Sequence, residues 1–167
     1  MNYNSTITCD KYCQDENRNQ YNLRSNYFFW YQWVGNSVHS LKYLTQELSN
    51  LKNKILLSFD QEIHKGYYKE NLDGILIYRK ISFLNHYCIR VLTKRKNTKN
   101  KNIELDLIYK LIDEIKNKGN KKFIIFILDT ENKEIFYKKH GFKISKSLYH
   151  KMLFNFDNTY NILYKVF

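Results

Sequence analysis

The sequence predicts an α/β fold, because segments typical of strands and of helices follow one another along its 167 residues. The clearest unit covers residues 121–144, where an apolar run, a polar turn, a short amphipathic segment, a glycine and a second apolar stretch occur in order. Hydrophobic residues make up 43% of the chain and aromatic residues 17%, enough for a folded core. We expect a single domain over residues 21–167, after a flexible lead-in over residues 1–20.

The organising unit supplies two candidate functional residues. Its apolar run, Phe123–Leu128, is rich in aromatic and β-branched residues and predicts a buried strand. Residues 131–140 predict a short helix, because acidic residues fall in its first turn and basic residues in its last. Gly141 stands where a helix ends in a left-handed residue, and another strand is expected after it. This order puts Asp129 at a strand end and Tyr137 on the next helix, where both can face one cleft.

Part of this unit resembles a known signature. Residues 135–142, IFYKKHGF, resemble the F-Y-x-K-x-G-F motif of the GCN5-related N-acetyltransferases, abbreviated GNAT. The longer stretch ILDTENKEIFYKKHGF is most similar to the glucosamine 6-phosphate N-acetyltransferases. The resemblance runs from Gly74 onward, in a divergent form typical of an AT-rich genome, since the chain lacks alanine and proline. It implies a mixed, mainly antiparallel sheet with helices on both faces and two strands that splay apart to admit acetyl-CoA.

The resemblance also implies a reaction, acetyl transfer from acetyl-CoA to the amine of glucosamine 6-phosphate. Tyr137 takes the position of the acid that protonates the departing thiolate, and Asp129 the position that orients and polarises the amine. Asn132 and Phe136 join Tyr137 in the implied cofactor-binding set. As alternatives, Tyr137 is a core aromatic, one of 15 tyrosines, and Asp129 is a turn residue or helix cap.

Two strands are predicted ahead of this unit, over residues 74–83 and 86–92, with a turn at Asn85. In the family resembled here, the second strand contains G-H-I-E-D. Only His86 matches, and the two carboxylates that handle the amine are missing. The resemblance therefore places His86 at the acceptor site but leaves the amine chemistry open.

The same strand is expected to contact the cofactor. A backbone N–H of its splayed part is expected to polarise the thioester oxygen. The implied contacts are Ile89, Arg90 and Val91.

A basic loop, residues 93–102, precedes an amphipathic helix that begins near Ile103, with Asn102 as the expected N-cap. A helix N-terminus in this position can bind phosphate through backbone N–H groups. The family's pyrophosphate loop, Q/R-x-x-G-x-G/A, aligns with residues 99–104, where both glycines are replaced. The implied contacts are Lys99, Lys101, Asn102, Ile103 and Glu104. Glu104 would repel a pyrophosphate unless it turns away or Lys94, Arg95 and Lys96 compensate. An ordinary surface loop is the alternative.

The remaining segments predict further elements. Residues 27–34 predict a buried strand rather than a platform for stacked bases, because basic residues do not interleave the aromatic ones. Residues 37–59 predict an amphipathic helix, with leucines and an isoleucine spaced by 3 and 4, followed by a polar connection over residues 60–73. Residues 142–156 predict a strand that is apolar on both faces, and residues 157–167 one more. Because the family resembled here dimerises through its C-terminal strand, we expect a homodimer through residues 142–156.

Composition limits the other function classes. The net charge of +12 suggests a polyanionic partner, but genome bias explains much of the lysine excess, so we expect no nucleic-acid partner and no membrane partner. The three cysteines include Cys9 and Cys13, but no second pair at ligand spacing completes a metal site, and none is expected. With no apolar run of membrane length and no signal-peptide pattern, a cytoplasmic location is expected. Three alternatives stay open: acetylation of another amine, such as a protein N-terminus, a polyamine or an antibiotic; a catalytically degenerate binding module; and a nucleic-acid binder.

Overall fold

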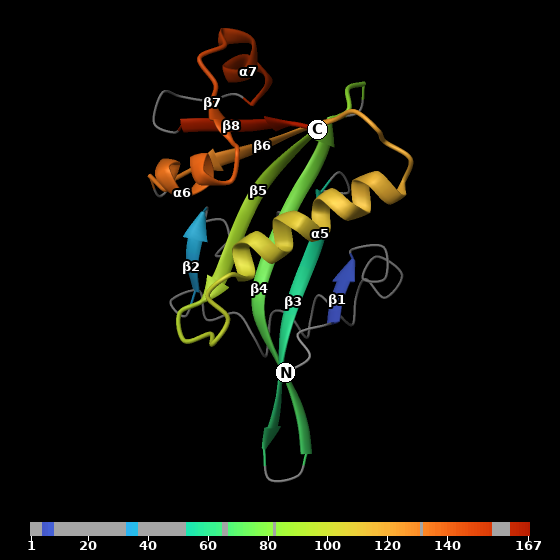
Figure 1. Cartoon of the computed structure of the whole chain (residues 1–167), viewed down its shortest axis with the longest axis vertical. Helices are drawn as coiled ribbons and strands as arrows, with labels where there is room; N and C mark the ends of the chain where they lie inside the picture. Colours follow the sequence, from blue (N-terminus) through green and yellow to red (C-terminus); the bar gives the residue numbers. More distant parts are fainter. Residues whose placement is uncertain are drawn as a thin grey trace.

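The computed structural model describes residues 5–8, 33–36, 53–64, 67–81, 83–130, 132–154 and 161–167. The strands are β1 (Ser5–Thr8), β2 (Trp33–Asn36), β3 (Asn53–His64), β4 (Tyr67–Ile81), β5 (His86–Arg95), β6 (Ile124–Asp129), β7 (Lys143–Ile144) and β8 (Asn161–Val166). The helices are α5 (Ile103–Asn117), α6 (Glu134–Lys139) and α7 (Leu148–Leu153). All the strands belong to one twisted sheet, and α5 lies across one of its faces (Figure 1).

The sheet is mixed and mainly antiparallel. Its strand order is β1-β3-β4-β5-β6-β8-β7, and β2 pairs with β5 outside this path. Among the described strands, only β5 and β6 run parallel, and α5 forms the crossover between them. The predicted α/β fold with this kind of sheet is therefore confirmed.

Apolar side chains fill both faces of the sheet. Tyr137 of α6 and the inward side of α5 pack with alternate residues of β4, β5 and β6 on what we call the α5 face. On the opposite face, one cluster forms around Trp33 and a second around Phe126, where Phe154 at the end of α7 also packs. Gly74 sets the distance of α5 from the sheet, because a Cβ there would lie 2.3 Å from Ile103 Cγ2.

The helix predicted over residues 37–59 is wrong for its last part, because residues 53–59 belong to β3; residues 37–52 lie outside the described part of the chain. The apolar side chains of this part alternate between the two faces of the sheet. Leu56 packs on the α5 face, whereas Ile55 and Leu57 pack on the opposite face. A strand buried on both faces gives a continuous apolar run, which also matches a helical spacing.

The polar connection predicted over residues 60–73 is also wrong. β3 and β4 continue as a paired two-stranded arm, up to the pair His64 and Tyr67, and the arm extends beyond the rest of the sheet (Figure 1). Polar composition misled the prediction because an arm without a core to cover needs no apolar face.

The strand predicted over residues 142–156 is wrong in most of its length. It is limited to β7, and α7 follows. The Oγ of Ser145 accepts a hydrogen bond from the backbone N–H of Ser147, which turns the chain before the helix. Leu148 and Met152, four residues apart, then share the outer side of α7 and are 75% and 77% exposed. The strand predicted over residues 157–167 is confirmed as β8.

Two predictions near the N-terminus fall mostly outside the described residues. Of the strand predicted over residues 27–34, the described part belongs to β2, which continues through Gly35 and Asn36. Within the lead-in predicted over residues 1–20, Ser5–Thr8 form β1, which pairs with β3. The division of the chain into lead-in and domain otherwise stays a prediction. No helix in the described ranges is long and apolar enough to cross a membrane.

Candidate active site where two parallel strands diverge

The two parallel strands stay together for only part of their length. They pair from His86 opposite Ile124 to Ile89 opposite Ile127, and then separate. Further along, β2 takes the edge of β5 that β6 has left, and pairs with it from Leu92 onward. Between these two partners, Arg90 and Val91 have no pairing on this edge within the described strands.

A β-bulge bends β5 at the same place. Tyr78 of β4 lies opposite Ile89, but Ile77 lies opposite Val91, so Arg90 is the extra residue of the bulge. The bulge leaves Arg90 without a partner on β4, and on the other edge no described strand pairs with Arg90 or Val91. Backbone N–H groups on that edge can donate to a ligand that enters between β5 and β6, and C=O groups there can accept from it.

Tyr137 reaches this point from α6. Its side chain is fully buried, and its phenol oxygen accepts a hydrogen bond of 2.5 Å from Asn36 Nδ2. Asn36 pairs with Leu92, directly after the unpaired residues of β5. The rings of Phe136 and Phe142 pack edge-on against the Tyr137 ring, with centroids 5.2 and 6.0 Å away. Tyr137 is therefore both a core aromatic and a hydroxyl group held beside the divergence.

Asp129 ends β6 and is buried, with an exposed fraction of 1%. Its Oδ1 accepts a hydrogen bond of 2.9 Å from the backbone N–H of Lys133, directly before α6. The backbone C=O of Lys133 in turn accepts from the N–H of Tyr137 at 3.1 Å. Asp129 thus fixes the turn that leads into the helix that carries Tyr137, which is the turn use that the sequence left open.

The N-terminus of α5 is arranged differently from the sequence expectation. Glu104 is buried and pairs with Lys133, with 3.1 Å between Oε1 and Nζ, rather than with the lysines of its own loop. Asn102 makes no side-chain cap; instead its N–H donates to Asn100 Oδ1 at 2.9 Å. Lys101 and Asn102 are exposed, whereas Ile103 is buried against β4. The Glu104 carboxylate thus turns away from the loop.

The remaining predicted residues are distributed on both sides of the sheet. Asn132 precedes α6 with a left-handed φ of 55° and is exposed, and Phe136 lies half-buried beside Tyr137. His86 is at the wrong end of β5: it lies level with Ile124, which puts it roughly 16 Å along the strands from Asp129. The predicted acceptor pair is therefore not brought together.

His86 has a structural environment instead. Its ring packs edge-on against Phe126, with centroids 5.4 Å apart, as does the ring of His150 at 4.8 Å. Burial, and then the neighbouring His150, lower the pKa of His86. Both effects favour a neutral imidazole in an aromatic cluster, distant from the divergence of the strands.

Sequence reasoning missed two residues of this site. Asn36 follows the strand predicted over residues 27–34 and belongs to no motif, and its contact with Tyr137 spans 101 positions of the chain. Lys133 was one of many lysines, although it links Asp129 to Glu104. Neither has a local signal, because each acts through a partner from another element. No group of three or more His, Cys, Asp or Glu that could hold a metal ion occurs in the parts that the structure describes.

Comparison with known proteins identifies the fold. No family model matches the sequence, and no curated protein does. The paiA N-acetyltransferase from Thermoplasma acidophilum, solved with coenzyme A, is 17% identical and has a TM-score of 0.53, with 98% of this chain and 100% of that chain covered. A GNAT-family acetyltransferase from Staphylococcus aureus Mu50 is 14% identical and has a TM-score of 0.55, with 97% and 99% covered.

A third similar structure belongs to a larger protein. N-acetylglutamate synthase from Neisseria gonorrhoeae, complexed with coenzyme A and N-acetyl-glutamate, is 14% identical and has a TM-score of 0.52 over 99% of this chain. This chain spans only 36% of that protein. At such low identities the likeness establishes the fold, and the chain has the GNAT acetyltransferase fold.

Proposed function

We propose that this protein is an acetyl-CoA-dependent N-acetyltransferase that acts on a small primary amine. The observation that carries the proposal is the position of the Tyr137 hydroxyl, held by Asn36 beside the edge of Arg90 and Val91 that no described strand pairs. A proton donor and backbone N–H groups at one gap between strands are what acyl transfer from a thioester requires. Glucosamine 6-phosphate is the acceptor that the sequence resemblance favours.

The residues of the chain have separate tasks in this reaction. Acetyl-CoA, when bound, supplies the acetyl group and a thiolate leaving group. The backbone at Arg90 and Val91 donates to the oxygen on which negative charge develops, and Tyr137 gives its proton to the leaving sulfur. Asp129 is a positioning residue, because it fixes the turn that leads into α6 through the N–H of Lys133. The attacking amine must be neutral; once the new C–N bond has formed and the C–S bond breaks, the nitrogen loses its extra proton to water and the Tyr137 phenolate takes a proton back from water.

The function is tested by incubating the purified chain with acetyl-CoA and one amine at a time, and by following thiol release. The amines are glucosamine 6-phosphate, spermidine and a peptide with a free N-terminus. Acetylation of one of them above the rate without protein supports the proposal. If no amine in the series is acetylated and acetyl-CoA does not raise the melting temperature, the proposal is wrong.

The phosphate groups of the cofactor give a second prediction. Lys99, Lys101 and the N-terminus of α5 are proposed to hold the pyrophosphate, with Asn132 and Phe136 beside the pantetheine arm. Coenzyme A should therefore bind at least about 10-fold more tightly than pantetheine, which lacks these phosphates, and the difference should shrink at high salt. Isothermal titration at two salt concentrations measures both affinities. Equal affinities would mean that the loop is an ordinary surface loop.

One observation favours a second candidate, a binding module that has lost catalysis. The side chain of Asn100 already accepts from the N–H of Asn102 and donates to Asp106 Oδ2 at 3.0 Å, so part of the anion site is occupied by the protein itself. Substitution Asn100→Gly removes both contacts. If the protein is an enzyme, Asn100→Gly should tighten coenzyme A binding or leave it unchanged. If the wild type does not bind coenzyme A and Asn100→Gly does, the binding module is favoured.

We also propose that the chain forms a homodimer through residues 142–156, as the resemblance implies, with α7 in place of the predicted strand. The exposed apolar side chains Leu148 and Met152 would then be covered by the partner subunit. Light scattering at micromolar concentration should give the mass of a dimer for the wild type and of a monomer for Met152→Glu. Phe83→Glu, at an equally exposed apolar residue outside this segment, is the control and should stay a dimer. A monomeric wild type would overturn the proposal.

A further inference from the structure

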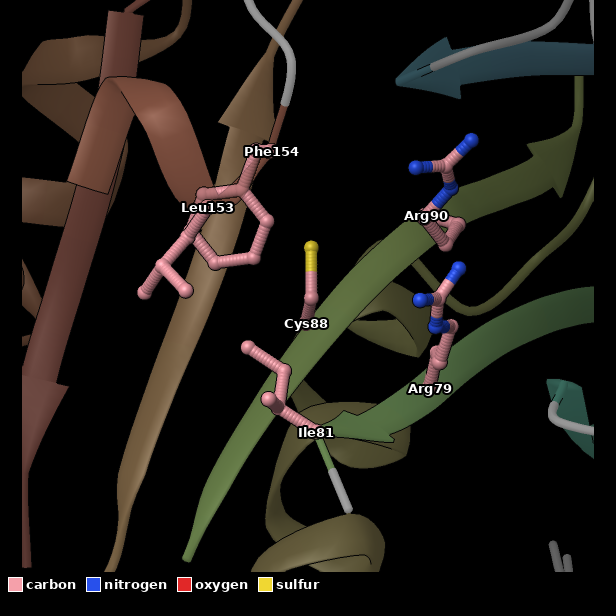
Figure 2. A pocket seen from close by; sticks show the side chains of 6 residues that line it. All are labelled: Arg79, Ile81, Cys88, Arg90, Leu153 and Phe154. Atoms are coloured by element: carbon pink, nitrogen blue, oxygen red, sulfur yellow. The ribbon is translucent and has the colours of Figure 1, made fainter. Parts of the chain in front are cut away.

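A pocket of about 430 Å³ opens on the face of the sheet opposite α5. Its described lining consists of Arg79, Ile81, Cys88, Arg90, Leu153 and Phe154 (Figure 2). Figure 2 shows the two guanidinium groups side by side and pointing the same way at one side of the space, with Leu153 and Phe154 at the other. The pocket thus has one cationic wall and one apolar wall.

Strand register brings the two arginines together. Arg79 of β4 lies opposite Cys88 of β5, and Arg90 is the bulged residue two positions further along β5. Diagonal neighbours on one face of an antiparallel pair are within reach of long side chains. Both arginines are half-buried, and within the described residues neither forms an ion pair with a carboxylate. Two adjacent cations are unfavourable unless an anion lies between them.

The thiol in the pocket does not supply that anion. Burial raises the pKa of Cys88 to about 12, although Arg90 and Arg79 act to lower it. The thiol is therefore neutral at physiological pH, and it is a poor nucleophile there. The charge that balances the two arginines must come from outside the described side chains.

We infer that this pocket binds an anionic group, carboxylate or phosphate, of the acceptor amine. Two guanidinium groups provide forked N–H donors that suit either anion. Arg90 lies where β5 has lost β6 and has not yet gained β2 as its described partner, so an anion on the arginine pair places the rest of a short acceptor close to the divergence of β5 and β6. The carbon skeleton of the acceptor would pack against Leu153 and Phe154. This inference rests on the proposed function and narrows the acceptor to small amines that carry an acidic group.

Matched pairs of acceptors test the inference. The phosphate pair is glucosamine 6-phosphate and glucosamine, and the carboxylate pair is 4-aminobutyrate and 1-aminobutane. For the wild type, kcat/KM should be higher for the charged member of at least one pair, and the pair that shows the preference identifies the anion. Arg79→Gln should raise KM for that charged acceptor by about 10-fold or more and leave the uncharged one nearly unchanged. Equal kcat/KM values within both pairs would overturn the inference and leave the acetyltransferase proposal intact.

Lys80→Gln is the matched control. Lys80 is the next residue along β4, and it loses the same charge, but its ammonium group lies on the α5 face over the Tyr87 ring, 5.8 Å from the centroid. Lys80→Gln should leave kcat and KM unchanged for every acceptor. A change in Lys80→Gln as large as in Arg79→Gln would mean that net charge, not the pocket, attracts the acceptor.

A binding measurement separates this inference from the proposed function. Inorganic phosphate and acetate, titrated into the protein and followed by amide NMR, should shift resonances of β4 and β5 in the wild type and in Lys80→Gln. Arg79→Gln should lose these shifts and keep its melting temperature. If these shifts occur but the protein acetylates no amine, anion binding in the pocket is supported and the acetyltransferase proposal is wrong. If the wild type shows no shifts, the inference that the pocket binds an anion is wrong.

Discussion

Replacing Tyr137 by phenylalanine should lower kcat by about 100-fold or more and leave the affinity for acetyl-CoA close to that of the wild type. The substitution keeps the ring, and so its packing against Phe136 and Phe142, but it removes the proton that the leaving sulfur takes. The lost hydroxyl matters mainly when negative charge develops on sulfur, which is why binding of the cofactor should change little. Stopped-flow measurement of thiol release, with acetyl-CoA and glucosamine 6-phosphate both saturating, gives the comparison.

Loss of the phenol also leaves the amide of Asn36 without its described acceptor, so the free energy of unfolding should fall by about 1–3 kcal/mol. Tyr78→Phe is the matched control. Its ring is also buried on the α5 face, and its hydroxyl donates to Glu114 Oε1 at 3.0 Å. Tyr78→Phe should lose a similar free energy of unfolding and keep the wild-type kcat. If kcat is unchanged in Tyr137→Phe while chemistry is rate-limiting, Tyr137 only packs the core and the proposed mechanism is wrong.

The local sequence pattern was sufficient to predict the part of the fold that carries Tyr137. β6, α6 and Gly141 lie where the unit over residues 121–144 predicts them, because its apolar run, charge order and glycine all favour the same structure. α5 begins at Ile103 as predicted, since its apolar residues repeat over four turns on one face. In these segments the local preference and the buried face agree.

The errors arise where burial on both faces or a local turn, and not the periodicity of apolar residues, decides the structure. Residues 53–59 satisfy a helical spacing but lie in the middle of the sheet, where both of their faces are covered. Residues 148–153 alternate in the sequence like a strand, but a turn at Ser145 converts them into a helix with an exposed apolar side. The sequence could not predict which residues contact the site residues, because those contacts come from distant parts of the chain. Asn36 and Tyr137 meet only because β2 occupies the edge of β5 that β6 leaves.

The second large effect is expected at Gly35, which lies in β2 next to Asn36. Gly35 has a φ of +136°, a conformation that alanine adopts only with strain of about 1–3 kcal/mol. A Cβ at this position would also lie 2.3 Å from the backbone oxygen of Leu92, which cannot move without distorting β5. Gly35→Ala should therefore push β2 away from β5, withdraw Asn36 from the phenol of Tyr137, and lower kcat by about 10-fold or more. The melting temperature should fall as well.

Gly119→Ala is the control that separates the effect of the steric clash in Gly35→Ala from the effect of backbone strain. Gly119 also has a positive φ, +84°, but a Cβ there would meet no atom within 4 Å. Gly119→Ala should lose about 1 kcal/mol of stability and keep the wild-type kcat, since it leaves β2 in place. In Gly35→Ala, an amide NMR spectrum should show the resonances of β2 and of the Arg90–Val91 segment displaced together. If that variant keeps both its kcat and the chemical shift of the Asn36 side-chain amide, the close approach of β2 to β5 does not hold Tyr137 at the site.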